Sequence, residues 1–486
     1  MLKHILLWTG MVLLVSIPLF LRLDKQPVRI WDEARLAMNA YEMSRDGNLL
    51  VTHFEGSPDM WNTKPPMMIW MQAACIKIFG LNEFAVRLPA AVAGLLTCVF
   101  LFWFSKRYFE DYMPGLIACL VLVTTNGYIH IHAARTGDYD ALLALFTTIF
   151  CCSLFLYIEK QSARYLHLFF AALTLSVLAK GVQGLLFLPA LAGYVIYRRQ
   201  FIPLLKNKWL YIHMLLFLLV AGGYYVLREI FNPGYLLAVW NNELGGRYLG
   251  TLEENRQPFN YYFLQLKNWL YKTWWWLSVA GIVVGIFAGI FRMRRLTIFV
   301  ALLSLTYLLF ISVSQTKLEW YAVPLYPLLC WLPAMLFYRL VLYLRGPDIH
   351  PTARLALPLL MLVLVFMFPY VNIVRKVYYG REYTWDEELY PISYVLQSAH
   401  RGHASLSGHV VCYQGYNTQL LFYIRALNRQ GQQIDFAEAS GLRTGTLAIA
   451  SEPEIKRYIE THYTYEVARE YYNTRIYKIL AVKSVF

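Results

Sequence analysis

Long apolar runs separated by short polar segments dominate this chain. A helix needs about 20 apolar residues to cross the hydrocarbon core of a bilayer, and eleven runs reach or approach that length. These runs span residues 5–23, 84–104, 113–131, 141–158, 166–178, 182–196, 210–227, 270–291, 297–311, 320–344 and 355–373. The pattern therefore predicts an α-helical polytopic membrane protein with about eleven transmembrane helices.

Two further regions carry a different periodicity. Between the first two runs lies a loop, residues 24–83, in which residues 33–45 and 66–79 have helical spacing; we expect two helices lying in the membrane interface. After about residue 376, strand-like runs alternate with helical ones. The strands are expected at residues 409–413, 446–450 and 475–482, and the helices at 418–427 and 452–462. We therefore predict a transmembrane domain over residues 1–375 and a small C-terminal α/β domain over residues 376–486.

The composition agrees with a membrane protein. Of the 486 residues 58% are hydrophobic and 15% are charged, whereas a soluble domain carries about a quarter charged residues. The net charge is +14, and many basic residues of the chain gather in the short loops near residues 106, 160, 198, 292 and 345. By the positive-inside rule these loops and the N-terminus are cytoplasmic, which places loop 24–83 and the C-terminal domain outside. No basic face with interleaved aromatic residues suits nucleic acid.

The outer loop 24–83 concentrates charge beside the membrane. Asp32, Glu33 and Arg35 lie about thirty residues before Lys64. Charges so close to apolar spans are costly and indicate a functional site. Two acids and two bases suit acid/base chemistry next to a phosphate group. The alternative is that Asp32 and Glu33 only favour the dipole of a helix that begins there.

Other polar residues fall on the same predicted outer side. They are Asp138 and Asp140 before the fourth span, Lys180, Arg256 and Tyr321. Asp138 and Asp140 could equally cap the span that follows them. Lys180-Gly181 could simply end a helix.

Taken together, these motifs resemble a known family. Residues 31–35 (Trp-Asp-Glu-Ala-Arg), Lys64-Pro65-Pro66 and the Phe-Gly…Arg-Leu-Pro pattern of residues 79–89 resemble the N-terminal signature of GT-C glycosyltransferases. More narrowly, they are similar to the aminoarabinose (lipid A) transferase and protein O-mannosyltransferase group. Residues 138–143, Lys180-Gly181, residues 256–262 and Tyr321-x-x-Pro324 are similar to later landmarks of the group.

The resemblance implies a function and roles for these residues. Such enzymes transfer a sugar from a polyprenyl-phosphate carrier to an envelope glycolipid, glycan or protein on the periplasmic side of the bacterial inner membrane, usually with inversion. It implies that Asp32, with Glu33, is catalytic. Donor phosphate would be bound by Arg35, Lys64, Arg256 and Tyr321, and Asp138, Asp140 and Lys180 would support the acceptor or the site.

One departure concerns metal. In aminoarabinose transferases an acidic residue precedes the Lys-Pro-Pro lysine and a histidine precedes the Arg-x-Pro-Phe step, and together these can hold zinc. Here the two positions are Thr63 and Asn255, neither of which is a usual zinc ligand. We therefore predict no zinc there and identify no cofactor. A divalent cation at Asp138 and Asp140 stays open.

The rival class is a transporter or flippase of a lipid-linked sugar or other small solute. It would also need polar residues in an apolar chain. However, charges within the spans are few, and the chain lacks paired helices broken by Gly or Pro in two related halves. The sequence favours the enzyme.

Overall fold

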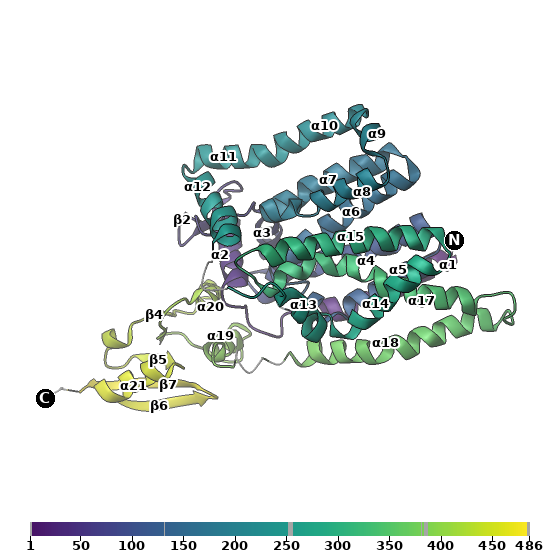
Figure 1. Ribbon diagram of the computed structural model, residues 1–486. Helices are drawn as coiled ribbons and strands as arrows, with labels where there is room; N and C mark the ends of the chain where they lie inside the picture. The colour runs from purple at the N-terminus through teal and green to yellow at the C-terminus, as the bar shows by residue number, and fades with distance from the viewer. Residues whose placement is uncertain (1, 131, 251–255, 381, 383–386, 484–486) are drawn as a thin grey trace.

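The computed structural model describes residues 2–130, 132–250, 256–380, 382 and 387–483. Most of this is helix, and Figure 1 shows the long helices running side by side, with the N-terminus at one end and the C-terminal sheet at the other. The helices of the bundle are α1 (Leu2–Phe20), α4 (Glu83–Phe109), α5 (Met113–Val123), α6 (Asp140–Lys160), α7 (Ala163–Lys180), α8 (Leu188–Tyr197), α9 (Phe201–Leu205), α10 (Lys208–Phe217), α11 (Gly223–Phe231), α12 (Tyr235–Val239), α13 (Tyr261–Gln265), α14 (Lys272–Phe287), α15 (Phe291–Val313), α16 (Tyr326–Leu329), α17 (Trp331–Leu344) and α18 (Ala353–Tyr379).

Seven helical stretches among the described residues are long and apolar enough to cross a membrane. A bent pair, Tyr261–Leu270 with Lys272–Phe287, would make an eighth. The expected count of eleven is therefore not confirmed, although every expected span falls on helix. The runs at residues 5–23, 113–131 and 182–196 correspond to the shorter apolar helices α1, α5 and α8, because turns or caps interrupt them.

The outer loop folds into two helices, as its spacing predicts. Helix α2 (Asp32–Asp46) begins with two acidic residues and ends at Gly47, which adopts the left-handed conformation (φ 74°). Helix α3 (Met67–Phe79) follows Pro65-Pro66, after the short hairpin of β1 (His53–Phe54) and β2 (Ser57–Pro58). However, α2 is buried along most of its length and packs against α3 and the C-terminal helix α20. It is thus enclosed by protein and does not lie exposed at an interface.

The C-terminal region forms a five-stranded sheet with three helices. The helices are α19 (Pro391–His400), α20 (Thr418–Arg429) and α21 (Pro453–His462). The strands are β3 (His409–Val411), β4 (Asp435–Phe436), β5 (Leu447–Ala450), β6 (Tyr463–Tyr471) and β7 (Thr474–Val482), in the order β4-β3-β5-β7-β6. Strand β3 pairs parallel with β4 and β5, and β7 pairs antiparallel with β5 and β6. The three expected strands and two expected helices are found; β4, β6 and α19 are additional.

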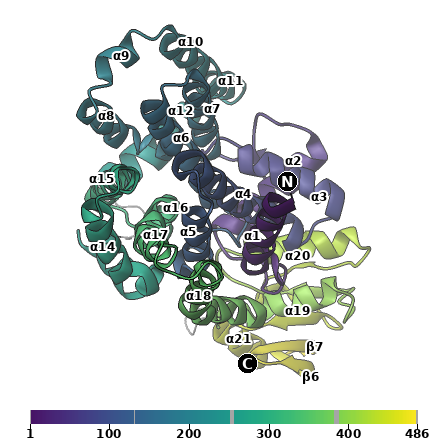
Figure 2. The same ribbon diagram turned by 90° about the vertical axis from the view of Figure 1, so that its right-hand side faces the viewer.

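This sheet region docks on the outer loop. Figure 1 shows α20 next to α2, which it contacts, and α19 near the outer end of α18, as does Figure 2. The Tyr423 hydroxyl of α20 donates to Glu83 at the start of α4, and the backbone N–H of Val28 donates to the same hydroxyl. Gln397 of α19 also donates to Glu83. One buried carboxylate therefore ties the C-terminal region to the helix bundle.

Candidate functional site

Asp32 stands at the first position of α2, directly after a strained turn. Trp31 has φ 69° and ψ −116°, a conformation that costs a non-glycine residue on the order of 1–3 kcal/mol and persists only where the surroundings enforce it. Its indole stacks on Tyr416 of the C-terminal region, with ring centroids 4.4 Å apart. The Asp32 side chain is 45% exposed, and its Oδ2 lies 3.9 Å from Nδ1 of His132. The carboxylate is thus held in place while nearly half of the side chain is exposed.

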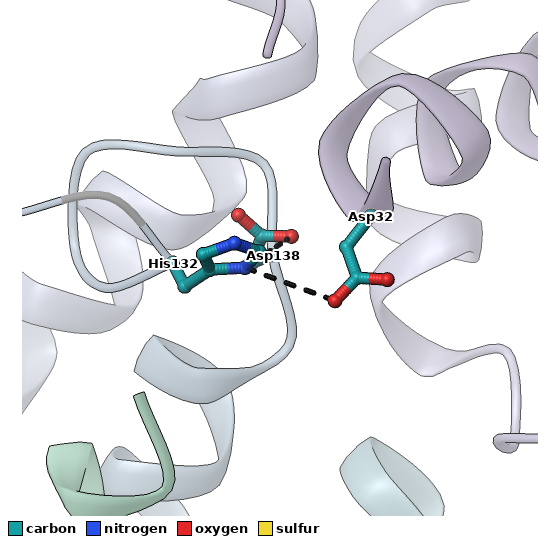
Figure 3. A group of neighbouring side chains, drawn as sticks. All are labelled: Asp32, His132 and Asp138. Carbon is teal, nitrogen blue, oxygen red and sulfur yellow. Dashed lines mark ion pairs between the residues drawn. The ribbon is translucent and has the colours of Figure 1, made fainter. Parts of the chain in front are cut away.

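His132 and Asp138 complete this group. Figure 3 shows the Asp32 carboxylate turned toward the His132 ring, with the Asp138 carboxylate beside the same ring. Nδ1 of His132 is 3.4 Å from Oδ1 of Asp138. The ring stacks on Trp320 at 3.6 Å, and His132 itself has a positive φ of 61°. Two strained residues, Trp31 and His132, therefore flank one carboxylate.

The charge of His132 follows from its neighbours. Burial lowers the pKa of His132, but the carboxylates of Asp138, Asp32 and Asp140 outweigh burial and raise the pKa to about 9. Asp138 is buried, and neither of its oxygens has a hydrogen-bond partner among the described residues. Because an uncompensated buried charge is costly, a protonated His132 is the group that stabilises the Asp138 carboxylate.

Asp140 and Lys180 form a separate buried pair. Lys180 Nζ donates to both carboxylate oxygens of Asp140, at 2.6 and 2.7 Å. The same ammonium lies 5.7 Å from the ring centre of Tyr321. The structure thus brings together three residues that the sequence placed far apart. The structure also separates Asp138 and Asp140, the two carboxylates at which a divalent cation was left open. Lys180 occupies the Asp140 carboxylate, while Asp138 lies beside Asp32.

A different set of side chains has the geometry for a metal ion. Donor atoms of Asp32, His132 and Asp138 all lie within 4.8 Å of one another, and carboxylate with imidazole ligands suit a divalent transition metal. The zinc position of the aminoarabinose transferases does not fit. Thr63 donates its hydroxyl to Glu243 at 3.3 Å, and Asn255 lies outside the described residues.

Glu33 has surroundings opposite to those of Asp32. It is fully buried. Its carboxylate accepts from Arg87 Nε and Nη2 at 2.7 and 2.9 Å, and from the backbone N–H groups of Arg29 and Gly137 at 2.7 and 2.8 Å. Burial raises the pKa of Glu33, but Arg87 and these N–H groups outweigh it and hold the pKa below its usual value. With both oxygens occupied, Glu33 is arranged to hold α2, α4 and the loop before α6 together.

The two expected phosphate-binding cations of the outer loop each pair with an acid. Arg35 makes a two-pronged contact with Asp59, at 2.9 and 2.8 Å. Lys64 Nζ lies 3.1 Å from Glu243 and 5.7 Å from the ring centre of Tyr139. Arg256 is exposed, pairs through its backbone with Thr316, and makes no contact with the Asp32 group in the described part of the chain. Of these cations, Lys64 with its single acidic contact is best placed to exchange that contact for a phosphate.

Several residues near the site were missed from the sequence. Asp59 lies in the charged outer loop, so its position was a usable signal. His132 lies six residues before Asp138 in the same segment, but nothing in the sequence links it to Asp32. Trp320, Glu243 and Tyr416 come from distant segments, and no local pattern singles them out.

Comparison with known proteins bears on the class. A family model described as "Dolichyl-phosphate-mannose-protein mannosyltransferase" matches residues 63–225. The undecaprenyl phosphate-alpha-4-amino-4-deoxy-L-arabinose arabinosyl transferase of Aeromonas hydrophila is 27% identical over 337 residues, which are 66% of this chain and 59% of that protein. A second such protein, the arabinosyl transferase 2 of Pseudomonas fluorescens, is 26% identical over a stretch that covers 76% of this chain and 63% of that protein. The chain spans about three fifths of these relatives.

Solved structures show the fold. ArnT from Cupriavidus metallidurans bound to undecaprenyl phosphate superposes with a TM-score of 0.70 at 16% identity, over 98% of both chains. The Archaeoglobus fulgidus oligosaccharyltransferase gives 0.50 at 11% identity, over 90% of this chain and 65% of that one. The protein therefore has the GT-C fold. The chain is thus similar in fold to ArnT, similar in sequence to aminoarabinose transferases and, over residues 63–225, to the protein mannosyltransferase family, in line with the resemblance of its motifs, and the transporter alternative is not favoured.

Proposed function

We propose that the protein is an integral-membrane glycosyltransferase that moves a sugar from a polyprenyl-phosphate donor to an acceptor of the cell envelope. The observation that carries this proposal is the Asp32 carboxylate, half exposed beside a buried His132–Asp138 pair at the end of the bundle where α2 and α20 meet. The relatives named above act on an undecaprenyl-phosphate-linked sugar, which supports this donor class for the present chain.

The proposed reaction is a single displacement. An acceptor oxygen attacks the anomeric carbon, the bond from that carbon to the phosphate oxygen breaks, and polyprenyl phosphate leaves, so the anomeric centre inverts. If the acceptor is a hydroxyl, its proton goes to Asp32, which acts as general base. If the acceptor is already an anionic phosphate, Asp32 orients the reactants. His132, held by Asp138 and Trp320, is a positioning residue for Asp32.

The leaving phosphate gains negative charge as the bond breaks. A fixed cation aimed at that charge stabilises the transition state more than the ground state. We assign this task to Lys64, which would exchange its contact with Glu243 for the donor phosphate. Arg35 is assigned to holding the outer loop around Lys64 in place through its contact with Asp59. The Asp140–Lys180 pair is assigned to holding the loop that carries Asp138.

We further propose the bacterial inner membrane as the location, with the N-terminus cytoplasmic and the C-terminal region periplasmic. The basic short loops support this orientation. The sheet region docks beside Asp32, so it shares the compartment of the site. The acceptor class is an envelope glycolipid of the lipid A type, a glycan or a protein.

The test separates an enzyme from a transporter. Purified protein in detergent is given polyprenyl-phosphate sugar labelled in the sugar, together with an envelope extract. We expect label in a new product and free polyprenyl phosphate in equal amounts, because transfer needs no closed membrane. Label that crosses a membrane only in sealed vesicles, with the donor chemically unchanged, would contradict the proposal.

A further inference from the structure

A charged cavity that does not include the Asp32 group takes no part in the proposed transfer. It lies between the segment after α1, the loop before α6 and the outer end of α18. Six cations line it: Arg22, Lys25, Arg29, Arg87, Arg135 and Lys376. No acidic side chain is among its lining residues in the described part of the chain. A concentration of like charge of this kind is unfavourable unless an anion offsets it.

Only part of this charge is balanced within the protein. Arg29 pairs with Glu382 at 2.6 Å, and Arg87 pairs with Glu33. Arg22, Lys25 and Arg135 have no acidic partner among the described residues. Arg135 donates to the backbone carbonyls of Pro18, Leu19 and Leu21 at the end of α1. Burial, and after it the nearby Arg87, lowers the pKa of Arg135 to about 10, as expected for a cation in a positive field.

The size of the cavity limits the ligand. Its volume of about 70 Å³ holds about five water-sized groups at ~10–15 Å³ each, which fits one phosphate group. Gly380 forms part of the wall, and a Cβ there would come within 2.9 Å of Lys25 Cγ. The absence of a side chain at Gly380 thus lets the backbone pack closely against Lys25 at the edge of the cavity.

The surroundings suit a phosphate that is attached to a lipid. The cavity lies at the ends of α1 and α18, and both helices expose apolar side chains along their length. Examples are Leu13 and Ile17 on α1, and Met367 and Val371 on α18. Acyl chains can lie along such helices while the headgroup reaches the cations.

We propose that this cavity is a binding site for a phosphate group, separate from the donor phosphate site at Lys64. The phosphate belongs to an anionic lipid of the outer leaflet or is free inorganic phosphate. The cavity backs onto the transfer site, because the Arg29 N–H and the Arg87 guanidinium both donate to Glu33, next to Asp32. An occupant would therefore stabilise the wall that carries Asp32. This inference goes beyond the proposed function and does not depend on it.

The experiment measures binding, not transfer. Purified protein in detergent is titrated calorimetrically with dihexanoyl phosphatidic acid, with inorganic phosphate, and with zwitterionic dihexanoyl phosphatidylcholine as the control without net charge. The double variant Arg22→Gln/Lys25→Gln removes two cations that have no acidic partner. The single variant Lys25→Gln is measured as well, so that the test holds even where the double variant does not fold. Lys77→Gln on α3, an exposed lysine outside the cavity, is the matched control.

We expect phosphatidic acid to bind the wild type and the control equally, and to bind the double variant at least tenfold more weakly. Tighter binding of phosphatidic acid than of inorganic phosphate assigns a lipid headgroup, and equal binding assigns free phosphate. Unchanged affinity in both cavity variants, or no binding of either ligand by the wild type, would overturn the proposal. A lack of transfer activity would leave this result unaffected.

Discussion

Asp32 and Glu33 are neighbours in the chain with the same charged group, yet their surroundings are opposite. Glu33 is buried and accepts hydrogen bonds on both oxygens. Asp32 is half exposed and faces His132. The sequence identified both as catalytic candidates, because nothing in the motif distinguishes two acids at a helix start. Burial separates them, and burial depends on which distant segments pack there.

His132 gives the site a pH dependence. Its pKa of about 9 in the folded protein lies above the ordinary value of about 6.5. The stabilisation it contributes, on the order of 3 kcal/mol, is therefore fully present below about pH 6.5 and is lost as the pH rises through about 9. We expect the melting temperature of the wild type to fall between pH 7 and pH 10 more steeply than that of His132→Gln, as measured by thermal unfolding in detergent. Parallel curves for the two proteins would show that His132 is not charged in this cluster.

Lys64 should matter for turnover more than for donor affinity. Lys64→Met keeps the apolar stem and removes the charge. We expect a fall in single-turnover transfer on the order of 10²-fold, as for the loss of one preorganised electrostatic group, with a smaller loss in donor binding. Lys267→Met, in another segment of the chain, is the control. Equal losses in binding and transfer would mean that Lys64 only docks the lipid.

At the scale of elements, the amphipathic spacing predicted α2 and α3 well, but not their depth. Helix α2 carries several apolar side chains on a face that α20 covers. That cover comes from nearly 400 residues further along the chain, so local periodicity could suggest an interfacial helix and nothing more. The apolar runs likewise located the helices, but the count of eleven spans is not confirmed, since seven or eight helical stretches of the described residues are long and apolar enough to cross a membrane. Hydropathy does not register turns and bends such as the one at Tyr271.

The anchoring of α2 can be tested at Glu33. Glu33→Gln removes the charge and presents an N–H₂ group to surrounding donors, which leaves Arg87 buried without its partner. Breaking a buried pair in this way costs about 3–5 kcal/mol. We expect a clearly lower melting temperature and yield, whereas Asp46→Asn at the exposed end of the same helix should leave both unchanged. A normally stable Glu33→Gln protein that has lost transfer would instead return Glu33 to a catalytic role.

At the scale of the whole molecule, the fold class and the likeness to the aminoarabinose transferases could be predicted from the sequence, while the assembly of the site could not. The motif at residues 31–35 contains Asp32, the proposed catalytic acid. The residues packed around it, His132 beside its carboxylate, Trp320 on His132 and Tyr416 on Trp31, come from three distant parts of the chain. The C-terminal region showed no chemistry in its sequence, and only its docking against Trp31 reveals a contribution.

The docking of the C-terminal region against Trp31 predicts that a substitution in this region changes the rate of transfer. Tyr416→Ala removes the ring that holds Trp31 in its strained conformation. An aromatic pair contributes about 0.5–1.5 kcal/mol, so we expect turnover to fall up to about tenfold with little change in melting temperature. Tyr472→Ala, on an exposed turn of the same sheet, should behave as the wild type. Equal rates for both variants would show that the C-terminal region does not position Asp32.

The central claim is that Asp32 acts in the transfer itself, and Asp32→Asn tests it most directly. The substitution keeps the volume, removes the charge and leaves the contacts of Glu33 intact. The measurement is single-turnover transfer of labelled sugar by purified protein, with donor binding and melting temperature recorded on the same samples and Asp46→Asn as the control. We predict normal donor binding and stability with transfer reduced by at least 10²-fold. Transfer at the wild-type rate by a stable Asp32→Asn protein would contradict the account.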